Sequence, residues 1–494
     1  MEKAEVLAVL NRMNTWWNGE PVPDSIYEDH RRRDFYKLFE KVTEGREIVT
    51  IRGPRQVGKT TIVGQLIDEL LPENVSRHEK EMMWVPHEPE NILYLNVDNS
   101  QILSDPEGVI DDSLQVYQDS VLGKSFRNLD EDVYVFIDEI QKSPNWEGEL
   151  KYYTDTYSNL RFIVTGSVST LIDRDADETL TGRLDRYSMY PMKFVEYVRY
   201  ENVIEDEVER STELRDALKT SVKESDPAEF VNKLSSAYGM MEQVGPEMRS
   251  LKDEYLLKGG YPDVLDEDYT GAYNVLDSNL RSTVRGDIPA TFDVKKEQSL
   301  FTLLNTCAAS SGQKMNVQNM ADTAGIDRDT AERYLEHLKE FFLISTCSKY
   351  YRSEYESGGR NKVYIQDVGH LNTLQGTLSK DAIHNPETVG KLLETACSDL
   401  LRRLQFHLSD YQDSTISYWD AQGEVDFVLS GTDYTLPVEV KAGDPNDRDL
   451  RGIRNFVEDD SYDAEFGVVV NDANVLDTDG DLVYVPSWLF FFIC

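Results

Sequence analysis

Cysteine is scarce in this sequence, and the few cysteines are far apart. The 494 residues contain only Cys307, Cys347, Cys397 and Cys494. Disulfide-stapled domains carry cysteine at high density, and thiolate metal sites need closely spaced cysteines. Neither pattern is present, so we expect reduced thiols with a structural role.

Long apolar runs are also missing. The C-terminal stretch WLFFFIC is far shorter than the roughly 20 apolar residues that a membrane-spanning helix needs. The N-terminal stretch MEKAEVLAVLNRMNTWW carries acidic residues and lacks the basic region and cleavage site of a secretory signal. We therefore expect a cytoplasmic protein with no membrane partner.

Positive charge is the third deficit. The chain has 51 Lys and Arg residues against 91 Asp and Glu residues, a formal net charge of −40 at pH 7, and the acidic residues are spread over its whole length. This composition resembles that of proteins from extreme halophiles, because molar salt shortens the Debye length to about 3 Å and screens the self-repulsion. A basic domain, the usual mark of a nucleic-acid-binding protein, is absent, which leaves only a local basic patch for such a role.

One motif predicts a nucleotide site. The stretch IRGPRQVGKTTI fits G-x-x-x-x-G-K-[ST] and follows a strand-like run, and its glycines let backbone N–H groups converge on phosphate oxygens. We expect Lys59 near the β- and γ-phosphates, the Thr60 hydroxyl on Mg²⁺, and Thr61 on the α-phosphate side, at the N-terminus of a helix whose dipole favours anions. The predicted nucleotide-binding residues are Gly53, Pro54, Arg55, Gln56, Val57, Gly58, Lys59, Thr60 and Thr61. The motif alone leaves ATP and GTP open.

Two later strand-like runs end in residues suited to hydrolysis. VYVFIDEIQ is apolar until two carboxylates, so we expect Asp138 to hold Mg²⁺ through water and Glu139 to act as the general base. LRFIVTGSVS ends in hydroxyl residues, of which Ser167 is the predicted γ-phosphate sensor. Arg183 and Arg186 are candidates for stabilising transition-state charge, in cis or across a subunit contact, although surface salt bridges explain either arginine equally well.

The length of the chain predicts about three domains. In the first part, strand-like runs alternate with helical patterns, which predicts a parallel α/β sheet. We expect a P-loop nucleotide-binding domain at 1–200, a helical insert and lid region at 201–296, a winged-helix-like segment at 297–350 and a second α/β domain at 351–494.

The predicted recognition helix of the winged-helix-like segment is RDTAERYLEHLKEFFLI. Apolar residues at helical spacing predict a core face: Ala331, Tyr334, Leu335, Leu338 and Phe341. Arg328, Arg333 and Lys339 are offset by four acidic residues on the same helix, so contact with DNA and contact with a protein are equally open.

Together these motifs resemble those of archaeal and bacterial AAA-type P-loop ATPases that carry a winged-helix segment and a C-terminal domain of restriction-endonuclease-like fold. The matching segments stand in the family's order: GPRQVGKTT, FIDEIQ, FIVTGS, TGRLDRYSMYPMKFVEY, LKGGYPDVL, KVYIQDVG, and GEVDFVL with LPVEVKAG. The resemblance implies ATP in preference to GTP, an additional strand between the Gly53 strand and the Asp138 strand, and a capacity to form a homo-oligomer.

Charged residues in the last third follow the pattern of a metal-dependent nuclease site. The two-residue period of a strand places Glu439 and Lys441 on one face of LPVEVKAG. Asp426 lies on the preceding predicted strand, and Glu394 lies on the helix before it. This set resembles the PD-(D/E)xK nuclease core, in which Asp426 and Glu439 would bind Mg²⁺ and Lys441 would orient or activate water. Ordinary charge alternation on a half-solvated hairpin gives the same pattern.

Three functions are compatible with the sequence, all with ATP and Mg²⁺ as cofactors. We favour a Mg²⁺-dependent ATPase whose nucleotide cycle moves a winged-helix and nuclease-like module on DNA or RNA. The second is an ATP-dependent switch or scaffold that acts on a protein partner and carries an inert nuclease-like domain. The third is an ATP-regulated, metal-dependent nuclease.

Overall fold

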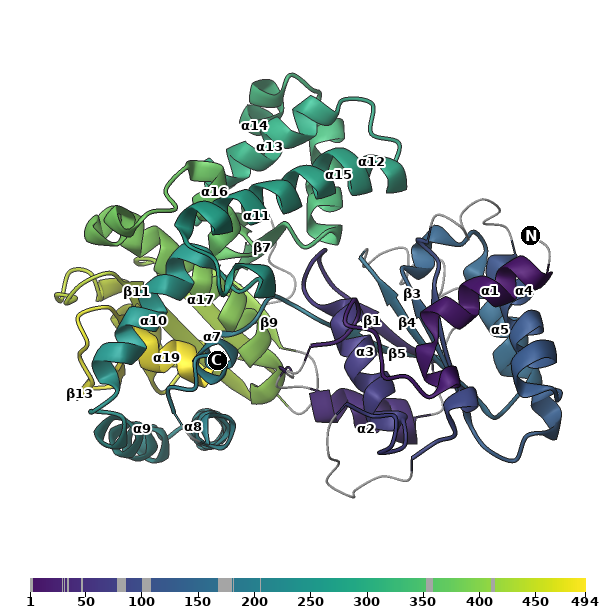
Figure 1. Cartoon of the computed structure of the whole chain (residues 1–494). Coiled ribbons are helices and arrows are strands. Elements are labelled where there is room, and N and C mark those ends of the chain that lie inside the picture. Colours follow the sequence, from purple (N-terminus) through teal and green to yellow (C-terminus); the bar gives the residue numbers. More distant parts are fainter. Residues whose placement is uncertain are drawn as a thin grey trace. The chain divides into compact units, whose positions relative to one another are not determined.

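The chain folds into two compact units, Met1–Tyr190 and Pro191–Cys494 (Figure 1). The computed structural model describes residues 3–28, 30, 32, 35–45, 48–77, 86–99, 108–167, 180, 182–204, 206–351, 359–409 and 414–494. Each unit has its own sheet and its own hydrophobic clusters. The finer division into four domains stays a prediction.

The first unit is built on a five-stranded parallel sheet in the order β2-β3-β4-β1-β5. Its strands are β1 (Ile48–Arg52), β2 (Ile92–Asn96), β3 (Val133–Asp138), β4 (Leu160–Gly166) and β5 (Leu184–Ser188). Its helices are α1 (Lys3–Met13), α2 (Phe35–Glu44), α3 (Lys59–Leu70), α4 (Val109–Tyr117) and α5 (Trp146–Thr156). Because β4 lies between β1 and β3, the additional strand implied by the family resemblance is confirmed.

Side-chain alternation along the strands explains why helices cover both faces of this sheet. In β3, Val135 and Ile137 join a core cluster with residues of α1, α4 and α5, whereas Tyr134 and Phe136 join a cluster with residues of α2 and α3. Every residue of β3 is buried, as expected for a parallel strand between two helical layers. The carboxyl ends of β1, β3 and β4 therefore meet at one edge of a rigid, three-layered platform.

The second unit contains a nine-stranded mixed sheet in the order β13-β14-β12-β11-β10-β9-β7-β8-β6. Its strands are β6 (Gln313–Lys314), β7 (Ile344–Lys349), β8 (Lys362–Ile365), β9 (Thr415–Trp419), β10 (Val425–Gly431), β11 (Tyr434–Lys441), β12 (Gly467–Asn471), β13 (Asp477–Asp479) and β14 (Leu482–Pro486). Its helices are α7 (Phe194–Tyr200), α8 (Glu207–Glu224), α9 (Ala228–Met240), α10 (Gly245–Lys258), α11 (Tyr269–Ser282), α12 (Ile288–Thr291), α13 (Glu297–Ala309), α14 (Val317–Ala324), α15 (Arg328–Glu340), α16 (Val368–Gln375), α17 (Pro386–Leu408), α18 (Arg451–Val457) and α19 (Ser487–Ile493).

Two segments of the second unit share this sheet. The first runs α13, β6, α14, α15, β7 and β8, and β8 pairs antiparallel with both β6 and β7. The second runs α17, β9, β10, β11, α18 and β12, with β10 antiparallel to β9 and β11, and β12 parallel to β11. Ser348 and Lys349 of β7 pair in parallel with Ser417 and Tyr418 of β9. This pairing makes the two segments one continuous sheet.

Most of the predicted elements are present, with shifted ends. The helices predicted within 297–350 are α13, α14 and α15, and the five residues predicted for the core face of α15 are all buried. However, α15 ends at Glu340, before the end of the apolar stretch predicted as helix. The reason is that Phe342 has a left-handed backbone (φ 57°) and that Ile344 begins β7.

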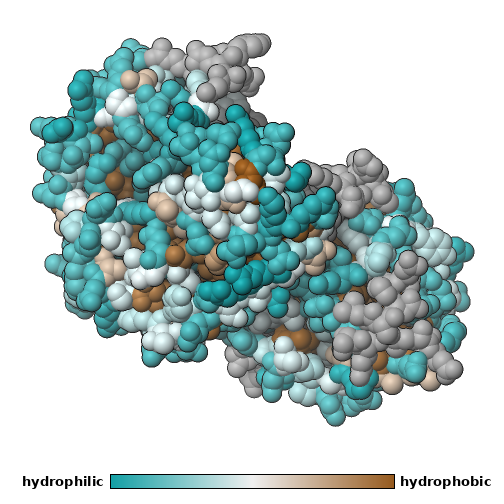
Figure 2. All heavy atoms as spheres, turned by 90° about the horizontal axis from the view of Figure 1, so that it is seen from above, coloured by the Kyte–Doolittle hydropathy of each residue, from teal (hydrophilic) through white to brown (hydrophobic). Residues whose placement is uncertain are grey.

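The deficits of the sequence have structural counterparts. All four cysteines are free and buried. Within the described residues, no helix combines the length and the apolar character that crossing a membrane requires. The C-terminal apolar stretch forms α19, whose residues are all buried. Hydrophilic residues cover most of the face shown in Figure 2.

Candidate functional site

The loop between β1 and α3 contains two glycines that meet different requirements. Gly58 has a φ of +94°, which other residues rarely adopt. Gly53 is not among the residues with positive φ, but a Cβ there would lie 2.0 Å from the carbonyl oxygen of Met189. Only Gly58 therefore fits the expectation that glycine is needed to bend the loop, whereas Gly53 is required by close packing against the segment after β5.

Lys59 is the first residue of α3 and is only 5% exposed. Its Nζ donates hydrogen bonds to the carbonyl oxygens of Gly53 (3.0 Å) and Pro54 (2.9 Å), and to Ser167 Oγ (3.3 Å) at the end of β4. Neutral acceptors thus hold the ammonium group at the mouth of the loop, where the motif predicts phosphate.

Thr60 and Asp138 supply oxygen donors to the same edge of the sheet. Thr60 Oγ1 donates to Asp138 Oδ2 at 2.8 Å, and the buried Asp138 also accepts hydrogen bonds from Tyr94 Oη (3.0 Å) and from the Thr165 hydroxyl. A hydroxyl and a carboxylate in direct contact are a donor set that fits Mg²⁺. Burial, followed by the Asp138 carboxylate, raises the pKa of Tyr94 well above its usual value, so Tyr94 stays a donor.

Glu139 follows β3 with a left-handed backbone, at φ 56° and ψ 44°. Its N–H donates to Thr165 Oγ1 at 3.1 Å, so β4 supports this uncommon conformation. The Glu139 carboxylate accepts hydrogen bonds from Gln141 Nε2 (2.5 Å) and from Ser167 Oγ (3.4 Å to each oxygen). Ser167 therefore contacts both Glu139 and Lys59, and the carboxylate faces the loop.

The remaining predicted loop residues have mixed environments. Arg55 and Gln56 are exposed, Pro54 and Val57 are buried, and Thr61 is half-buried on α3. All belong to the loop or to the first turn of α3. Their roles in nucleotide binding stay predictions.

Arg183 lies where the amino ends of β1 and β5 meet, whereas the loop lies at the carboxyl end of β1. Leu184 begins β5 beside Ile48 at the amino end of β1, whereas the loop leaves the carboxyl end of β1. The Arg183 guanidinium pairs with Asp155 at 2.8 Å, and both side chains are partly exposed. This position is incompatible with a catalytic role in cis, and a role across a subunit contact stays a prediction.

Two groups near the loop belong to none of the sequence motifs. Arg32 donates from Nη1 to the carbonyl oxygen of Val57 (3.2 Å) and from Nη2 to that of Tyr190 (3.0 Å). Tyr94 binds Asp138 from the neighbouring strand β2. Neither residue belongs to a local motif, because tertiary contacts between distant segments bring each one to the site.

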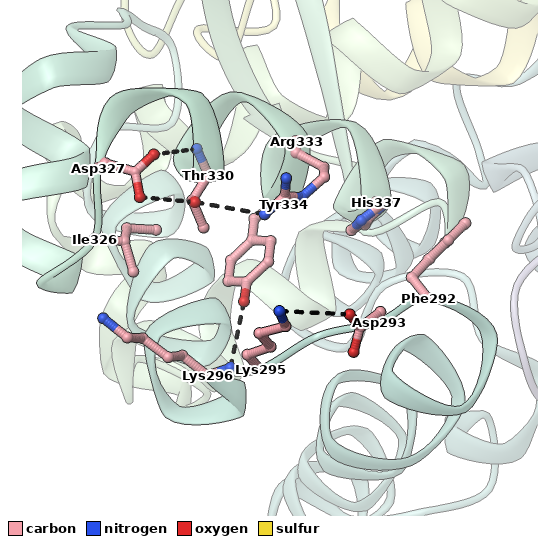
Figure 3. A pocket seen from close by; sticks show the side chains of 10 residues that line it. All are labelled: Phe292, Asp293, Lys295, Lys296, Ile326, Asp327, Thr330, Arg333, Tyr334 and His337. Carbon is pink, nitrogen blue, oxygen red and sulfur yellow. Dashed lines mark hydrogen bonds and ion pairs between the residues drawn. The ribbon is translucent and has the colours of Figure 1, made fainter.

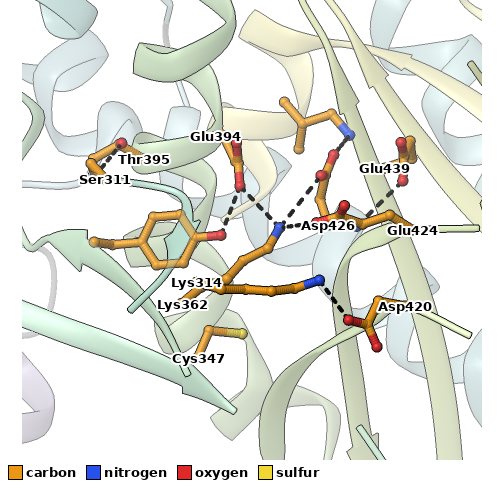
Figure 4. A network of polar contacts seen from close by, with 12 residues as sticks. Ser311, Lys314, Cys347, Lys362, Glu394, Thr395, Asp420, Glu424, Asp426 and Glu439 are labelled. Carbon is orange, nitrogen blue, oxygen red and sulfur yellow. Dashed lines mark hydrogen bonds and ion pairs between the residues drawn. The ribbon is translucent and has the colours of Figure 1, made fainter. Parts of the chain in front are cut away.

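A second cluster, in the second unit, contains the four charged residues predicted in the last third, and Figure 4 shows three of them, Glu394, Asp426 and Glu439. Asp426 Oδ2 accepts a hydrogen bond from the N–H of Val440 at 2.9 Å and lies 3.9 Å from Lys441 Nζ. Lys441 Nζ lies 2.5 Å from Glu439 Oε1, and the other carboxylate oxygen of Glu439 accepts from the N–H of Asp426 at 3.3 Å. Strand pairing between β10 and β11 thus brings these side chains together.

The strand β8 links Glu394 to this cluster. Tyr364 Oη donates to Glu394 Oε1 at 2.7 Å, and Lys362 Nζ lies 3.5 Å from the same oxygen. Lys362 Nζ also lies 2.8 Å from Glu424 Oε1 and 4.0 Å from Asp426 Oδ1. The sequence motifs did not predict Lys362, Tyr364 or Glu424 as site residues, because a pattern within one strand does not reveal its partners across the sheet.

Burial and neighbouring charges perturb the titration of the cluster. Burial, followed by the Asp426 carboxylate, raises the pKa of Glu394 to about 7 and that of Glu439 to about 8. Burial alone would lower the pKa of Lys362, but the surrounding carboxylates outweigh it and raise that pKa above its ordinary value. Within the described ranges, no three or more His, Cys, Asp or Glu side chains are grouped to hold a metal ion. Two lysines are interleaved with the carboxylates, and the metal site stays a prediction.

The parallel sheet and the loop between β1 and α3 fit a P-loop NTPase, and comparison with known families agrees. Residues 45–198 match the model of an AAA domain. Residues 249–381 and 389–490 match the models of two domains of unknown function, DUF8612 and DUF4143. The chain thus combines an AAA-type P-loop ATPase domain with two domains of unknown function.

Similar chains occur in a bacterium and an archaeon. An uncharacterized protein of Haemophilus influenzae is 24% identical over 402 residues, which cover 80% of this chain and 82% of that protein. An uncharacterized protein of Methanocaldococcus jannaschii is 20% identical over 398 residues, covering 79% and 74%. Among solved structures, a Walker-type ATPase of Pyrococcus abyssi matches 70% of this chain and 96% of that chain at 15% identity, with a TM-score of 0.39.

Proposed function

We propose that this protein is a Mg²⁺-dependent ATPase whose nucleotide cycle acts on a nucleic-acid-binding second unit. One observation supports the ATPase activity: five polar side chains lie together at the carboxyl edge of the parallel sheet. They are Lys59, Thr60, Asp138, Glu139 and Ser167. A P-loop, a carboxylate at the end of a buried strand and a second carboxylate beside it are the parts that phosphoryl transfer to water needs.

Each group has a role that follows from its position. Backbone N–H groups of the loop and the N-terminus of α3 bind the phosphates. Lys59 exchanges its carbonyl acceptors for phosphate oxygens, and Thr60 and Asp138 hold Mg²⁺, which neutralises charge on the phosphates when bound. Glu139 positions the attacking water and accepts its proton. Ser167, between Lys59 and Glu139, contacts the γ-phosphate.

The test of this function removes the phosphate-facing charge. Lys59→Ala should abolish measurable binding of Mg-ATP, or its turnover, because the loop keeps its backbone donors but loses its only ammonium group. Isothermal titration and phosphate release, both in molar KCl, measure the two steps. Lys37→Ala, at an exposed position on α2, is the matched control. Unchanged affinity together with unchanged turnover in Lys59→Ala would refute the site.

The topology of the second unit supports a winged-helix reading. The order α13, β6, α14, α15, β7, β8, with β8 paired between β6 and β7, is helix, strand, two helices and a hairpin, the order of a winged helix. In such modules the helix equivalent to α15 enters the DNA major groove. This order supports DNA or RNA as the partner of the second unit.

A pocket beside α15 adds a local concentration of positive charge (Figure 3). It has a volume of about 440 Å³ and is lined by Phe292, Asp293, Lys295, Lys296, Ile326, Asp327, Thr330, Arg333, Tyr334 and His337. Asp327 caps α15 by accepting from Thr330, so the helix N-terminus partly offsets its charge. Lys295, Lys296 and Arg333 line the opening together with Asp293, which lies 3.9 Å from Lys295, and Asp327, so the lining keeps an excess of one positive charge. On a chain of net charge −40, this local excess supports a nucleic-acid partner.

The C-terminal cluster supports a second activity, metal-dependent cleavage of phosphodiesters. The order α17, β9, β10, β11, α18, β12 supports the proposal of a restriction-endonuclease-like core, and Asp426, Glu439 and Lys441 lie within contact distance in it. In this reading Asp426 and Glu439 hold Mg²⁺ and Lys441 orients water.

Assays with nucleic acid separate the candidate functions. Phosphate release with and without DNA or RNA tests coupling, and plasmid cleavage by the parent and by Asp426→Ala tests the nuclease. If DNA or RNA stimulates ATP turnover and the plasmid is not cleaved, the result favours an ATPase that moves its second unit on nucleic acid. If DNA and RNA leave ATP turnover unchanged and the plasmid is not cleaved, the result favours the switch that acts on a protein partner.

A further inference from the structure

Lys362 has an unusual position for a lysine. Its side chain on β8 is 3% exposed, and its ammonium group lies within 4.0 Å of three carboxylates, those of Glu394, Glu424 and Asp426. Nζ also lies 5.3 Å from the centre of the Tyr418 ring. Burying an ammonium group is costly unless charged partners surround it. The lysine is thus held in place by the carboxylates.

The lysine and the carboxylates come from different parts of the chain. Lys362 lies within residues 249–381, the match to DUF8612, whereas Glu394, Asp426 and Glu439 lie within residues 389–490, the match to DUF4143. The parallel pairing of β7 with β9 brings β8 near the cluster. Tyr364 follows Lys362 by two residues on β8, and its hydroxyl donates to Glu394. The strand β8, which forms a hairpin with β7, therefore supplies two side chains that contact the cluster.

The cluster contains two more carboxylates than ammonium groups. Its carboxylates are Glu394, Glu424, Asp426 and Glu439, and its ammonium groups are Lys362 and Lys441. When all six are ionised, two negative charges are uncompensated, which is the charge of one divalent cation; because burial raises the pKa of Glu394 to about 7 and that of Glu439 to about 8, this state is only partly populated at pH 7. Lys362 Nζ already lies 4.0 Å from Asp426, one of the two predicted metal ligands.

We propose that Lys362 is a built-in counter-ion of this pocket and that a divalent cation binds Asp426 and Glu439 in competition with it. The inference rests on the metal-dependent activity proposed above. Metal binding pushes the ammonium group away from Asp426 and exposes it, and the displaced group becomes a donor for a phosphate oxygen of the substrate. Lys362 then sets the metal affinity of the pocket and links it to the hairpin of β7 and β8.

The first experiment measures Mn²⁺ affinity by isothermal titration of the full chain without nucleotide, at constant ionic strength. Lys362→Met, which keeps the length of the stem and removes the charge, should bind Mn²⁺ at least about tenfold more tightly than the parent, equivalent to about 1.4 kcal/mol. Lys314→Met is the matched control, because Lys314 of β6 pairs with Asp420, the residue after β9, at 2.5 Å and is not paired with any of the three carboxylates. Its affinity should equal that of the parent. Asp426→Asn should lose the binding.

A second measurement needs no variant at Lys362 and covers the case in which Lys362→Met does not fold. Acetylation of the parent, read by mass spectrometry, should leave Lys362 unmodified without metal, because its side chain is 3% exposed. Saturating Mn²⁺ should increase its acetylation several-fold, while Lys314, 37% exposed, should react equally in both conditions.

The outcomes distinguish the counter-ion role of Lys362 from metal binding at Asp426 and Glu439, on which that role rests. If Asp426→Asn loses Mn²⁺ but Lys362→Met binds no more tightly than Lys314→Met, or if Mn²⁺ leaves Lys362 acetylation unchanged, the counter-ion role is wrong and the metal pocket stands. If neither the parent nor Lys362→Met binds Mn²⁺, both proposals are wrong. Tighter binding in Lys362→Met, lost again in the double variant with Asp426→Asn, supports both.

Discussion

Replacement of Glu139 by glutamine tests the proposed general base directly. The substitution keeps the size of the side chain and an oxygen that can accept from Ser167, so the left-handed backbone and its support by Thr165 should persist. The amide cannot accept the proton of the attacking water. We therefore expect Mg-ATP to bind Glu139→Gln with an affinity close to that of the parent while hydrolysis becomes much slower.

The size of the expected loss follows from the role. A positioned general base contributes about 10²- to 10⁴-fold in rate, or about 2.7 to 5.5 kcal/mol in activation free energy. Phosphate release at saturating Mg-ATP in molar KCl measures turnover, and titration calorimetry measures binding. Glu73→Gln, the same chemical change at an exposed position after α3, is the control. Parent-like turnover in Glu139→Gln would mean that this carboxylate is structural, and lost binding would mean that it shapes the nucleotide pocket.

Two further predictions concern stability. Raising KCl from about 0.1 M to about 2 M should raise the melting temperature by at least about 4 °C, since screening relieves repulsion within a chain of net charge −40; a flat or falling curve in thermal melts would contradict this. Gly64→Ala in α3 should destabilise the first unit by about 1 to 3 kcal/mol, because the added Cβ would lie 1.8 Å from the carbonyl oxygen of Ile26. Gly239→Ala in α9, where nothing lies within 4 Å of the added Cβ, should instead stabilise by up to about 1 kcal/mol. Denaturant unfolding measures the free energy of unfolding of both variants, and an equal loss of stability in Gly64→Ala and Gly239→Ala would refute the steric explanation.

Local patterns pointed to residues that the structure brings together at the first site, because the parts of this site are local. The loop, the strand before it and the buried strand that ends at Asp138 are each continuous in sequence, and a parallel sheet brings their carboxyl ends to one edge. Arg183 shows the limit of this reasoning. It is close to β5 in sequence, yet it precedes the strand and therefore lies at the other edge of the sheet. Direction along a strand, and not distance along the chain, decides which side chains meet.

The second cluster was only partly predictable for a related reason. Alternation along β11 correctly grouped Glu439 with Lys441, and the hairpin partner β10 brought Asp426 beside them. Lys362 depends on the pairing of β7 with β9, and β7 itself begins in an apolar stretch that continues the helical pattern of α15. No periodicity within a single segment encodes a pairing between segments so far apart in sequence.

The two clusters hold a buried lysine in physically different ways, and the difference bears on how each would respond to its ligand. Lys59 donates to the carbonyl oxygens of Gly53 and Pro54 and to the Ser167 hydroxyl, which are neutral, so a phosphate that replaces these three acceptors offers a stronger, charge-assisted partner. Lys362 is surrounded by carboxylates, and moving it away leaves them uncompensated until a cation arrives. Exchange at Lys59 is therefore favourable with nucleotide alone. At Lys362, exchange requires a cation first, so a substrate phosphate reaches this lysine only after metal has bound.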